Sequence, residues 1–168
     1  MTDRSGNFIT SNDKVGTIQY WNVASNEPRQ SNKIGAKGTN SMIFLDNEAN
    51  IGGRILFALK NGALGVYNLK RRTLEFETET GHFETVFGVE YCASNKDLLA
   101  SCSYDGTVRV WNSNNMKLLA VNDTNFNSVQ ARLEKKIIYS ISWHPTDTKI
   151  AMSTVNGNLV IFEALKNK

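Results

Sequence analysis

One short pattern recurs four times along the 168-residue chain and limits what it can fold into more than any other feature. In each copy a glycine is followed by apolar residues two and four positions later, and by an aromatic residue at the fifth position. The glycines are Gly16, Gly62, Gly106 and Gly157, at spacings of 46, 44 and 51 residues. Periods of about 40–45 residues are typical of repeats built from four short strands. The pattern therefore predicts a chain of repeated β units.

The clearest copy lies between Leu98 and Asn112. The pair Asp105-Gly106 is typical of a tight turn, because aspartate tolerates turn conformations and glycine accepts positive φ. After it, Val108 and Val110 alternate with more polar residues, as expected of a strand with two different faces. This segment is predicted to be a β-hairpin.

Further strands are predicted on both sides of the recurring turns. Candidates directly before the turns are Phe8–Ser11, Arg54–Leu59, Leu98–Ser103 and Lys149–Ser153. Inner-strand candidates upstream of the last three copies are Ser41–Leu45, Val86–Tyr91 and Ile137–Trp143, and outer-strand candidates are Thr73–Thr78 and Lys117–Val121. The single helical signal, Ser128–Lys136, lies in the longest connection, which is read as an inserted loop. The predicted fold class is all-β.

The third copy also carries a characteristic order of residues. Gly81-His82 is followed by an apolar strand, then by Ser101-x-Ser-x-Asp-Gly, then by a strand that ends at Trp111. In this order the chain resembles the WD-repeat β-propeller family. The resemblance implies about three and a half four-stranded blades: an incomplete one near 1–34, then 35–80 and 81–124, and a last one at 125–168 that lacks an outer strand.

The resemblance further implies that His82, Ser101, Asp105 and Trp111 form a structural tetrad that fastens the third blade. The chemistry is sound without the family, because a buried imidazole and a buried indole N–H need the acceptors that a hydroxyl and a carboxylate supply. A hydrolase triad is the alternative interpretation of the histidine, serine and aspartate. It is disfavoured because Asp105 lies in a hairpin turn and a tryptophan ends the relay. The other copies depart from the tetrad.

Composition argues against several classes of site. Two histidines and two cysteines, with no Cys-x-x-Cys pair, are too few for a metal centre. No phosphate-binding, dinucleotide-binding or nucleophile motif occurs, so no cofactor is expected. Cys92 and Cys102 are expected to be buried free thiols. No apolar run approaches the roughly 20 residues of a membrane span and the start of the chain has no signal-peptide pattern, so a cytoplasmic, intracellular protein is expected.

The expected function is that of a non-enzymatic scaffold, which binds other proteins or peptides through loops at the rim of the propeller. Candidate rim residues are Tyr104, Arg109, Arg132, Lys135 and Lys136. For Arg109 the alternative is that its aliphatic stem packs against the neighbouring blade.

Two other functions are weighed against the scaffold. Binding of nucleic acid or of an acidic partner would use Lys70-Arg71-Arg72 and Lys135-Lys136, but a net charge of +3 is too small to indicate it. A propeller-based enzyme would need convergent catalytic residues, and the sequence offers none.

The number of blades also predicts how the ring is completed. A closed ring usually has about seven blades, so the rest is expected from a longer parent chain, from a second copy in a homodimer or from a partner. The start in mid-blade favours a longer parent chain. The runs Asn61–Asn68, Gly81–Phe87 and Ile138–Pro145 resemble long family members with several propellers.

Overall fold

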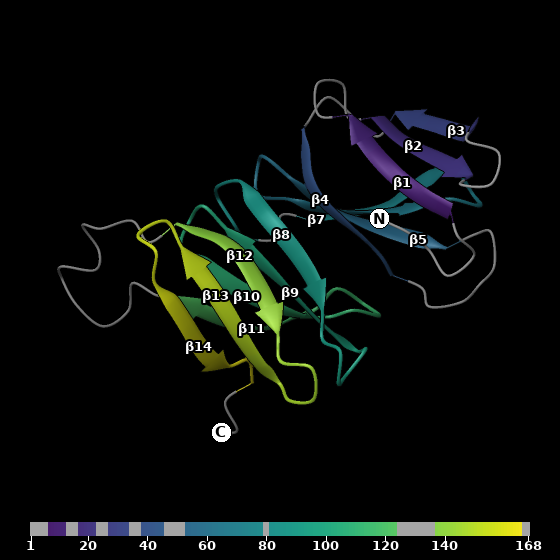
Figure 1. Cartoon of the computed structure of the whole chain (residues 1–168). Helices are drawn as coiled ribbons and strands as arrows, with labels where there is room; N and C mark the ends of the chain where they lie inside the picture. Colours follow the sequence, from purple (N-terminus) through teal and green to yellow (C-terminus); the bar gives the residue numbers. More distant parts are fainter. Residues whose placement is uncertain are drawn as a thin grey trace. The chain divides into compact units, whose positions relative to one another are not determined.

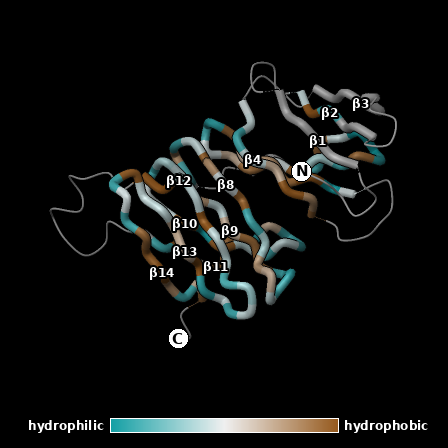
Figure 2. Tube along the Cα trace, in the orientation of Figure 1, coloured by the Kyte–Doolittle hydropathy of each residue, from teal (hydrophilic) through white to brown (hydrophobic). Residues whose placement is uncertain are grey.

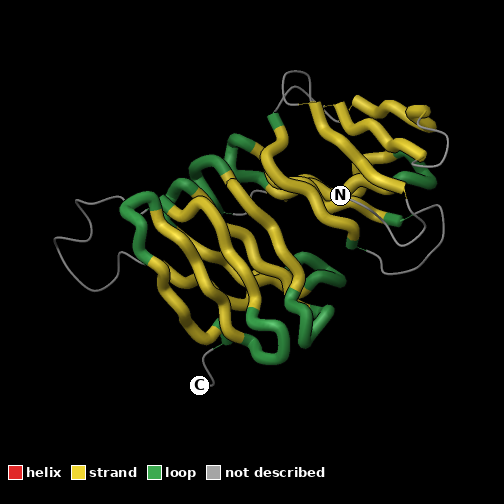
Figure 3. Tube along the Cα trace, in the orientation of Figure 1, coloured by secondary structure: helices red, strands yellow, loops and turns green. Residues whose placement is uncertain are grey.

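The computed structural model describes residues 7–12, 17–22, 27–33, 38–45, 53–78, 81–123 and 137–165. All regular structure in these ranges is β-strand, and every strand pairing in them is antiparallel (Figures 1 and 3). The predicted all-β class is therefore confirmed. The chain divides into two compact units, Met1–Gly81 and His82–Lys168, and each is described by itself.

Unit 1 contains two sheets. The first has the order β1-β2-β3, and the second has the order β4-β5-β6-β7. Their strands are β1 (Asn7–Asn12), β2 (Thr17–Asn22), β3 (Glu27–Lys33), β4 (Thr39–Phe44), β5 (Arg54–Leu59), β6 (Leu64–Asn68) and β7 (Thr73–Thr78). Strands that follow one another in sequence are neighbours, so each sheet is a meander of hairpins.

Unit 2 also contains two sheets, a four-stranded one with the order β8-β9-β10-β11 and a three-stranded one with the order β12-β13-β14. Their strands are β8 (Val86–Tyr91), β9 (Leu98–Ser103), β10 (Thr107–Asn112), β11 (Leu118–Asp123), β12 (Ile138–Trp143), β13 (Lys149–Thr154) and β14 (Leu159–Glu163). These are the meanders expected of partial propeller blades. The exact blade limits near 34, 80 and 124 stay a prediction.

Three turns between the second and third strands share one backbone design. Gly62, Gly106 and Gly157 have φ values of 87°, 83° and 77°, a region that glycine enters without steric cost. In each turn the glycine N–H donates to the carbonyl oxygen three residues earlier, over 3.2, 3.1 and 3.0 Å respectively. The turn around Gly16 lies outside the described residues.

Each of these turns is also tied to the start of its own sheet by a backbone hydrogen bond. The donor is the N–H just after the second strand, and the acceptor is the carbonyl oxygen of the residue just before the first. The donor and acceptor pairs are Lys60 and Gly38 at 3.0 Å, Tyr104 and Thr85 at 2.9 Å, and Val155 and Ile137 at 2.9 Å. The loop that enters a sheet and the turn beside it are thus one joined structure.

The core of unit 1 lies where strands of its two sheets meet. Its buried members are Ile18, Ile55, Phe57, Leu59, Ala63 and Tyr67. Phe57 faces Gly65 on the neighbouring strand, and its ring fills the space that a Cβ on Gly65 would need. Gly65 therefore serves packing, because any larger side chain would collide with that ring.

The core of unit 2 lies between its two sheets. Alternate residues of β9 and β13 contribute to it, as the period of two in a strand requires. Its buried members are Cys92, Leu98, Ala100, Cys102, Val108, Val110, Ile138, Ile141, Trp143, Ile150, Met152 and Ala164. Because one core serves both sheets, unit 2 is held together by apolar packing across them.

Candidate functional site

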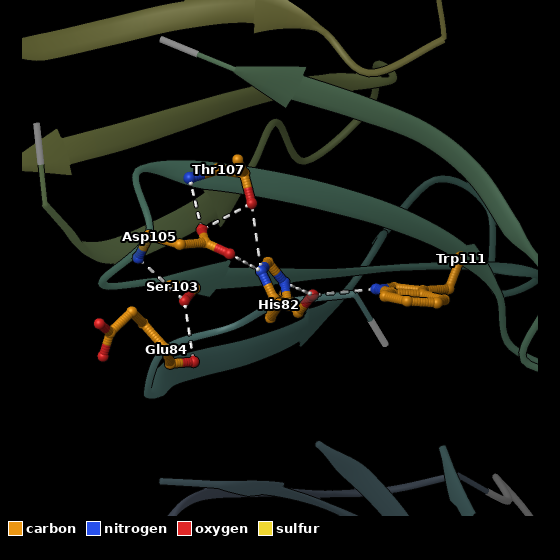
Figure 4. Close-up of polar contacts among 7 residues, drawn as sticks. His82, Glu84, Ser103, Asp105, Thr107 and Trp111 are labelled. Carbon is orange, nitrogen blue, oxygen red and sulfur yellow. Dashed lines mark hydrogen bonds and ion pairs between the residues drawn. The ribbon is translucent and has the colours of Figure 1, made fainter. Parts of the chain in front are cut away.

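The structure brings the four residues of the expected tetrad together in unit 2. His82 Nδ1 lies 2.9 Å from Asp105 Oδ2, and His82 Nε2 lies 2.9 Å from Ser101 Oγ (Figure 4). The indole N–H of Trp111 donates to the same Ser101 oxygen over 2.9 Å. The four side chains thus form one chain of hydrogen bonds from the turn to the far end of β10.

Thr107 and Ser103 extend this network, and the sequence interpretation missed both. The backbone N–H and the hydroxyl of Thr107 donate to Asp105 Oδ1 over 2.9 and 2.7 Å. The Ser103 hydroxyl donates to the Glu84 carbonyl over 3.2 Å and accepts from the Asp105 N–H over 3.1 Å (Figure 4). A serine or threonine two residues from a turn aspartate is the signal that points to such contacts.

One arrangement of protons satisfies all of these bonds. Ser101 accepts from Trp111 and donates to His82 Nε2, so the imidazole carries its proton on Nδ1 and donates it to Asp105. Burial lowers the pKa of His82, although the bond to Asp105 opposes that effect. Burial alone would raise the pKa of Asp105, but the bonds from His82 and Thr107 outweigh it and lower that pKa. The pair is therefore a neutral histidine beside a carboxylate.

The serine, histidine and aspartate follow the order of a hydrolase triad, but they are closed to a substrate. The side chains of His82 and Asp105 are 0% exposed, and Ser101 is also 0% exposed. The Ser101 oxygen already accepts the Trp111 indole proton. A nucleophile needs an open path to the reacting carbonyl. The arrangement fits a structural fastener and not a catalytic site.

The five candidate rim residues have different outcomes. Tyr104 lies in the turn between β9 and β10 and is half-buried, whereas Arg109 lies within β10, opposite Ser101, rather than in a loop. Burial lowers the pKa of Arg109, as expected of a guanidinium packed along the sheet. Arg132, Lys135 and Lys136 lie outside the described residues, so their role stays a prediction.

Tyr104 belongs to a group of three aromatic rings, and the sequence pattern did not point to the other two, Phe87 and Tyr139. The Phe87 ring centroid, on β8, lies 6.2 Å from that of Tyr104 and 4.9 Å from that of Tyr139, on β12. Tyr139 is 49% exposed, and Phe87 and Tyr104 are half-buried. We call these three residues the aromatic cluster. It lies at the end of unit 2 where the turn after β9 meets the starts of β8 and β12.

A polar joint links the two sheets of unit 2. The Trp143 indole N–H donates to the Glu90 carbonyl over 3.1 Å, and the Ser142 hydroxyl lies 3.4 Å from Glu90 Oε1. Glu90 Oε2 is buried, and no described residue gives it a hydrogen bond. Burial raises the pKa of Glu90, and hydrogen bonding from the Trp143 backbone N–H and from the Ser142 hydroxyl opposes that effect. The joint therefore holds a carboxylate that is only partly satisfied.

The remaining ionisable groups show no reactive centre in the described part of the chain. Cys92 and Cys102 are buried and free, as expected, and burial raises the pKa of Cys102 to about 12. The described residues contain no group of three or more His, Cys, Asp or Glu placed to hold a metal ion. Lys70, Arg71 and Arg72 are exposed in the turn between β6 and β7, where Arg71 pairs with Glu75 at 3.5 Å.

No helix long and apolar enough to cross a membrane occurs in the described ranges.

Comparison with known proteins identifies the repeat. The family model described as WD domain, G-beta repeat, matches residues 73–112, which run from β7 through β10. The match thus includes Ser101, Asp105 and Trp111 and both strands of the third hairpin.

Three relatives carry the same kind of similarity. Glutamate-rich WD repeat-containing protein 1 of Dictyostelium discoideum is 28% identical over 122 residues, which are 65% of this chain and 25% of that protein. Coronin-7 of Bos taurus is 31% identical over 86 residues, 50% of this chain and 8% of that protein. Ribosome biogenesis protein YTM1 of Debaryomyces hansenii is 35% identical over 63 residues, which are 38% of this chain and 13% of that protein. The chain spans a quarter or less of each.

Proposed function

This chain is a WD-repeat protein, and from that premise we propose that it is a non-enzymatic scaffold that binds segments of other proteins at the aromatic cluster. The observation that carries the proposal is the partial exposure of three neighbouring aromatic rings, tilted against one another, that come from two sheets. Aromatic side chains on a fixed frame offer large contact area at low entropic cost, and they are enriched among residues that dominate binding energy.

The surroundings of the cluster support recognition of an apolar or aromatic anchor. Tyr104 and Tyr139 combine an apolar ring with a hydroxyl that can donate to a partner's backbone. The tetrad and the backbone tie between Tyr104 and Thr85 hold the turn in place before binding. A preformed surface loses little conformational entropy when a partner binds.

A displayed library of random peptides tests the proposal, because such a library requires no identified partner. Peptides selected on the wild-type chain should bind the double variant Tyr104→Ala/Tyr139→Ala about tenfold or more weakly, as expected when two anchor residues are truncated. The matched control is Tyr91→Ala, which removes an aromatic residue from the opposite end of β8. Equal loss in the control, or undiminished binding to the double variant, would refute this site.

A second copy or further blades of the same polypeptide are proposed to cover β14. Among the described strands β14 pairs only with β13, and Leu159 and Ile161 on it are 70% and 63% exposed. Figure 2 shows β14 largely in the colour of hydrophobic residues. A free edge strand with exposed apolar residues favours pairing with another strand. Light scattering on the purified chain would give a dimer mass if a second copy covers β14, and a monomer would refute the homodimer.

Three further points are also proposals: nucleic-acid binding, a resemblance to one particular WD-repeat protein and the cellular setting. Nucleic-acid binding by Lys70-Arg71-Arg72 is a lesser alternative, because Arg71 is already paired with Glu75. We also propose that the chain is related to WD repeat-containing protein seventeen, which it resembles in the runs Asn61–Asn68, Gly81–Phe87 and Ile138–Pro145. An intracellular setting is likewise a proposal.

A further inference from the structure

Two Asn-Gly pairs occupy equivalent turns, Asn61-Gly62 between β5 and β6 and Asn156-Gly157 between β13 and β14. In such a pair the backbone nitrogen of the glycine can attack the asparagine side chain, because glycine has no Cβ to hinder the approach. From the surroundings of the two turns, we infer that Asn156 is a site of spontaneous deamidation and that Asn61 is protected.

The turn at Asn156 leaves the reacting groups open. Asn156 and Gly157 are both exposed, and a Cβ placed on Gly157 would meet nothing within 4 Å. In the described part of the chain, no hydrogen bond or ion pair holds the Asn156 side chain. Its amide group is therefore free to rotate toward the glycine nitrogen.

The hairpin that carries Asn156 is also at the edge of its sheet. The Gly157 N–H donates to the Thr154 carbonyl over 3.0 Å, and this bond must break before the glycine nitrogen can react. β14 pairs with β13 alone among the described strands, and Leu159 next to the turn is 70% exposed. Edge segments with few buried contacts open at low free energy.

Asn61 has the same neighbour but a different environment. Its Oδ1 accepts the Ala63 N–H at 3.4 Å, and Gly62 is buried. Its hairpin lies in the middle of a four-stranded sheet, between β4 and β7. Ring closure there requires a buried glycine to move and a central hairpin to open, which makes Asn61 an internal control for Asn156.

The reaction balances with water as its single co-reactant. The Gly157 nitrogen forms a bond to Asn156 Cγ, the bond from Cγ to Nδ2 breaks, and ammonia leaves with the proton lost by the Gly157 N–H. The product is a five-membered succinimide. Water then opens either of the two ring bonds to nitrogen, giving an aspartate with the normal backbone or an isoaspartate with one extra methylene in the backbone.

The product places a negative charge near the aromatic cluster. Val155, beside Asn156, donates its N–H to the Ile137 carbonyl over 2.9 Å, and Tyr139 follows two residues later. Deamidation would thus disfavour acidic peptides at that end of unit 2. This effect on binding rests on the proposed function, whereas the reaction itself does not.

Peptide mapping by mass spectrometry tests the reaction directly. The purified chain is incubated in mildly alkaline buffer at physiological temperature, and the gain of one mass unit is followed in the peptides that contain Asn156 and Asn61. Asn156 should react about tenfold or more faster than Asn61, because Asn61 must lose an extra hydrogen bond and open a central hairpin. An isoaspartate-specific methyltransferase should label the product.

Two controls separate the effect of structure from that of sequence. In denaturant the rates of the two pairs should become similar, since both are Asn-Gly pairs and the contacts of the fold are then lost. Asn156→Gln should abolish the mass gain at this position, because its longer side chain would have to form a less favourable ring. A rate at Asn61 equal to or above that at Asn156 in the folded chain, or no reaction at Asn156, would overturn the inference whether or not the aromatic cluster binds peptides.

Discussion

The turns at Asp105 and Asn156 have the same backbone conformation but differ in the contacts of their side chains. Asp105 accepts bonds from His82 and from two groups of Thr107, whereas no described residue binds the side chain of Asn156. The residue five positions before the turn glycine is Ser101 in sheet β8–β11 and Met152 in sheet β12–β14. Met152 is 2% exposed and belongs to the core. One sheet fills this position with a polar network, and the other fills it with a hydrocarbon side chain.

Sheet β4–β7 also has an apolar side chain at this position. Phe57 occupies the position of Ser101, and its ring fills the space above Gly65. Replacing all members of a buried polar network by apolar groups can be nearly neutral, whereas removing one member leaves its partners buried and unpaired. The comparison therefore teaches that the polar network is one of two ways to fill this position. A single substitution destabilises the network by leaving buried polar groups unpaired, whereas in the apolar core it does so by leaving a cavity.

Within the polar network, the largest effect is expected from Asp105→Ala. It removes the acceptor for His82 and Thr107 and should lower the free energy of unfolding by about 2–3 kcal/mol. The matched variant Asn156→Ala removes an exposed side chain and should change it by less than about 0.5 kcal/mol. Chemical denaturation of both variants gives these values. Similar losses in the two would mean that the turns do not differ as their contacts indicate.

The next largest effect is expected from Ser101→Ala. It leaves the Trp111 indole N–H and His82 Nε2 without their shared partner, at a loss of about 1–2 kcal/mol. Met152→Ala in the other sheet should lose about 2–4 kcal/mol through a cavity instead. Replacement by a larger apolar side chain distinguishes the two mechanisms. Met152→Leu fills most of the cavity and should retain most of the stability that Met152→Ala loses, whereas Ser101→Val gives Trp111 and His82 no hydrogen-bond partner and should be no more stable than Ser101→Ala.

Acid should weaken the polar network before it affects the apolar cores. The folded-state pKa values of His82 and Asp105 are both lowered, so the unfolded chain binds more protons as the pH falls, first through about 6.5 and then through about 4. The melting temperature should therefore fall from about pH 7 to about pH 5. A variant that already lacks the network, His82→Ala, should show a shallower decline. An equally steep decline in that variant would assign the effect to other groups.

A smaller effect of opposite sign is expected at the joint between the two sheets. The folded-state pKa of Glu90 is raised, so its contribution is unfavourable once the pH rises through that pKa and the partly buried carboxylate becomes charged. Glu90→Gln should therefore raise stability at neutral pH by about 0.5–1 kcal/mol, with allowance for the partial exposure of Glu90. The gain should vanish in acid. If Glu90→Gln instead lowered the free energy of unfolding at neutral pH, the charged carboxylate of Glu90 would stabilise the fold.

The smallest effect is expected in the turn of Lys70, Arg71 and Arg72. All three are exposed, and the Arg71 pair with Glu75 is a surface pair, so their joint replacement by alanine should cost less than about 1 kcal/mol. The same variant tests the lesser alternative function. If nucleic acid binds there, affinity for an oligonucleotide should fall with salt in the wild type and be lost in the variant.

The periodicity of the sequence predicted the hairpins, because alternation and turn glycines are local signals. The four residues that the structure brings together, His82, Ser101, Asp105 and Trp111, were implied by the resemblance to the WD-repeat family and not by the periodicity. The periodicity did not reveal Thr107 in the network or Phe87 and Tyr139 in the aromatic cluster. Thr107 lies in the same repeat as Asp105, and a threonine two residues after a turn aspartate is a local signal that points to this contact. The contact between Phe87 and Tyr139 depends instead on how strands of different repeats meet, and a pattern within one repeat carries no information about that packing.

The joint at Glu90 was missed for the same reason. Glu90 is an ordinary charged residue in an alternating strand, and only the neighbouring Trp143 and Ser142 give it a role. Likewise, the burial of Arg109 follows from its place in β10 and not from its charge.

The backbone ties from Lys60 to Gly38, from Tyr104 to Thr85 and from Val155 to Ile137 have a consequence for how such a chain can diversify. Each tie fixes the first residue of a sheet from inside that sheet, so the start of the strand does not depend on the length of the connection that precedes it. Foreign segments inserted just before Gly38 or Ile137, or before Gly81 so that His82 and Glu84 stay joined to their sheet, should be tolerated without a shift of register. These three positions are suitable points for grafting a recognition sequence onto the fold.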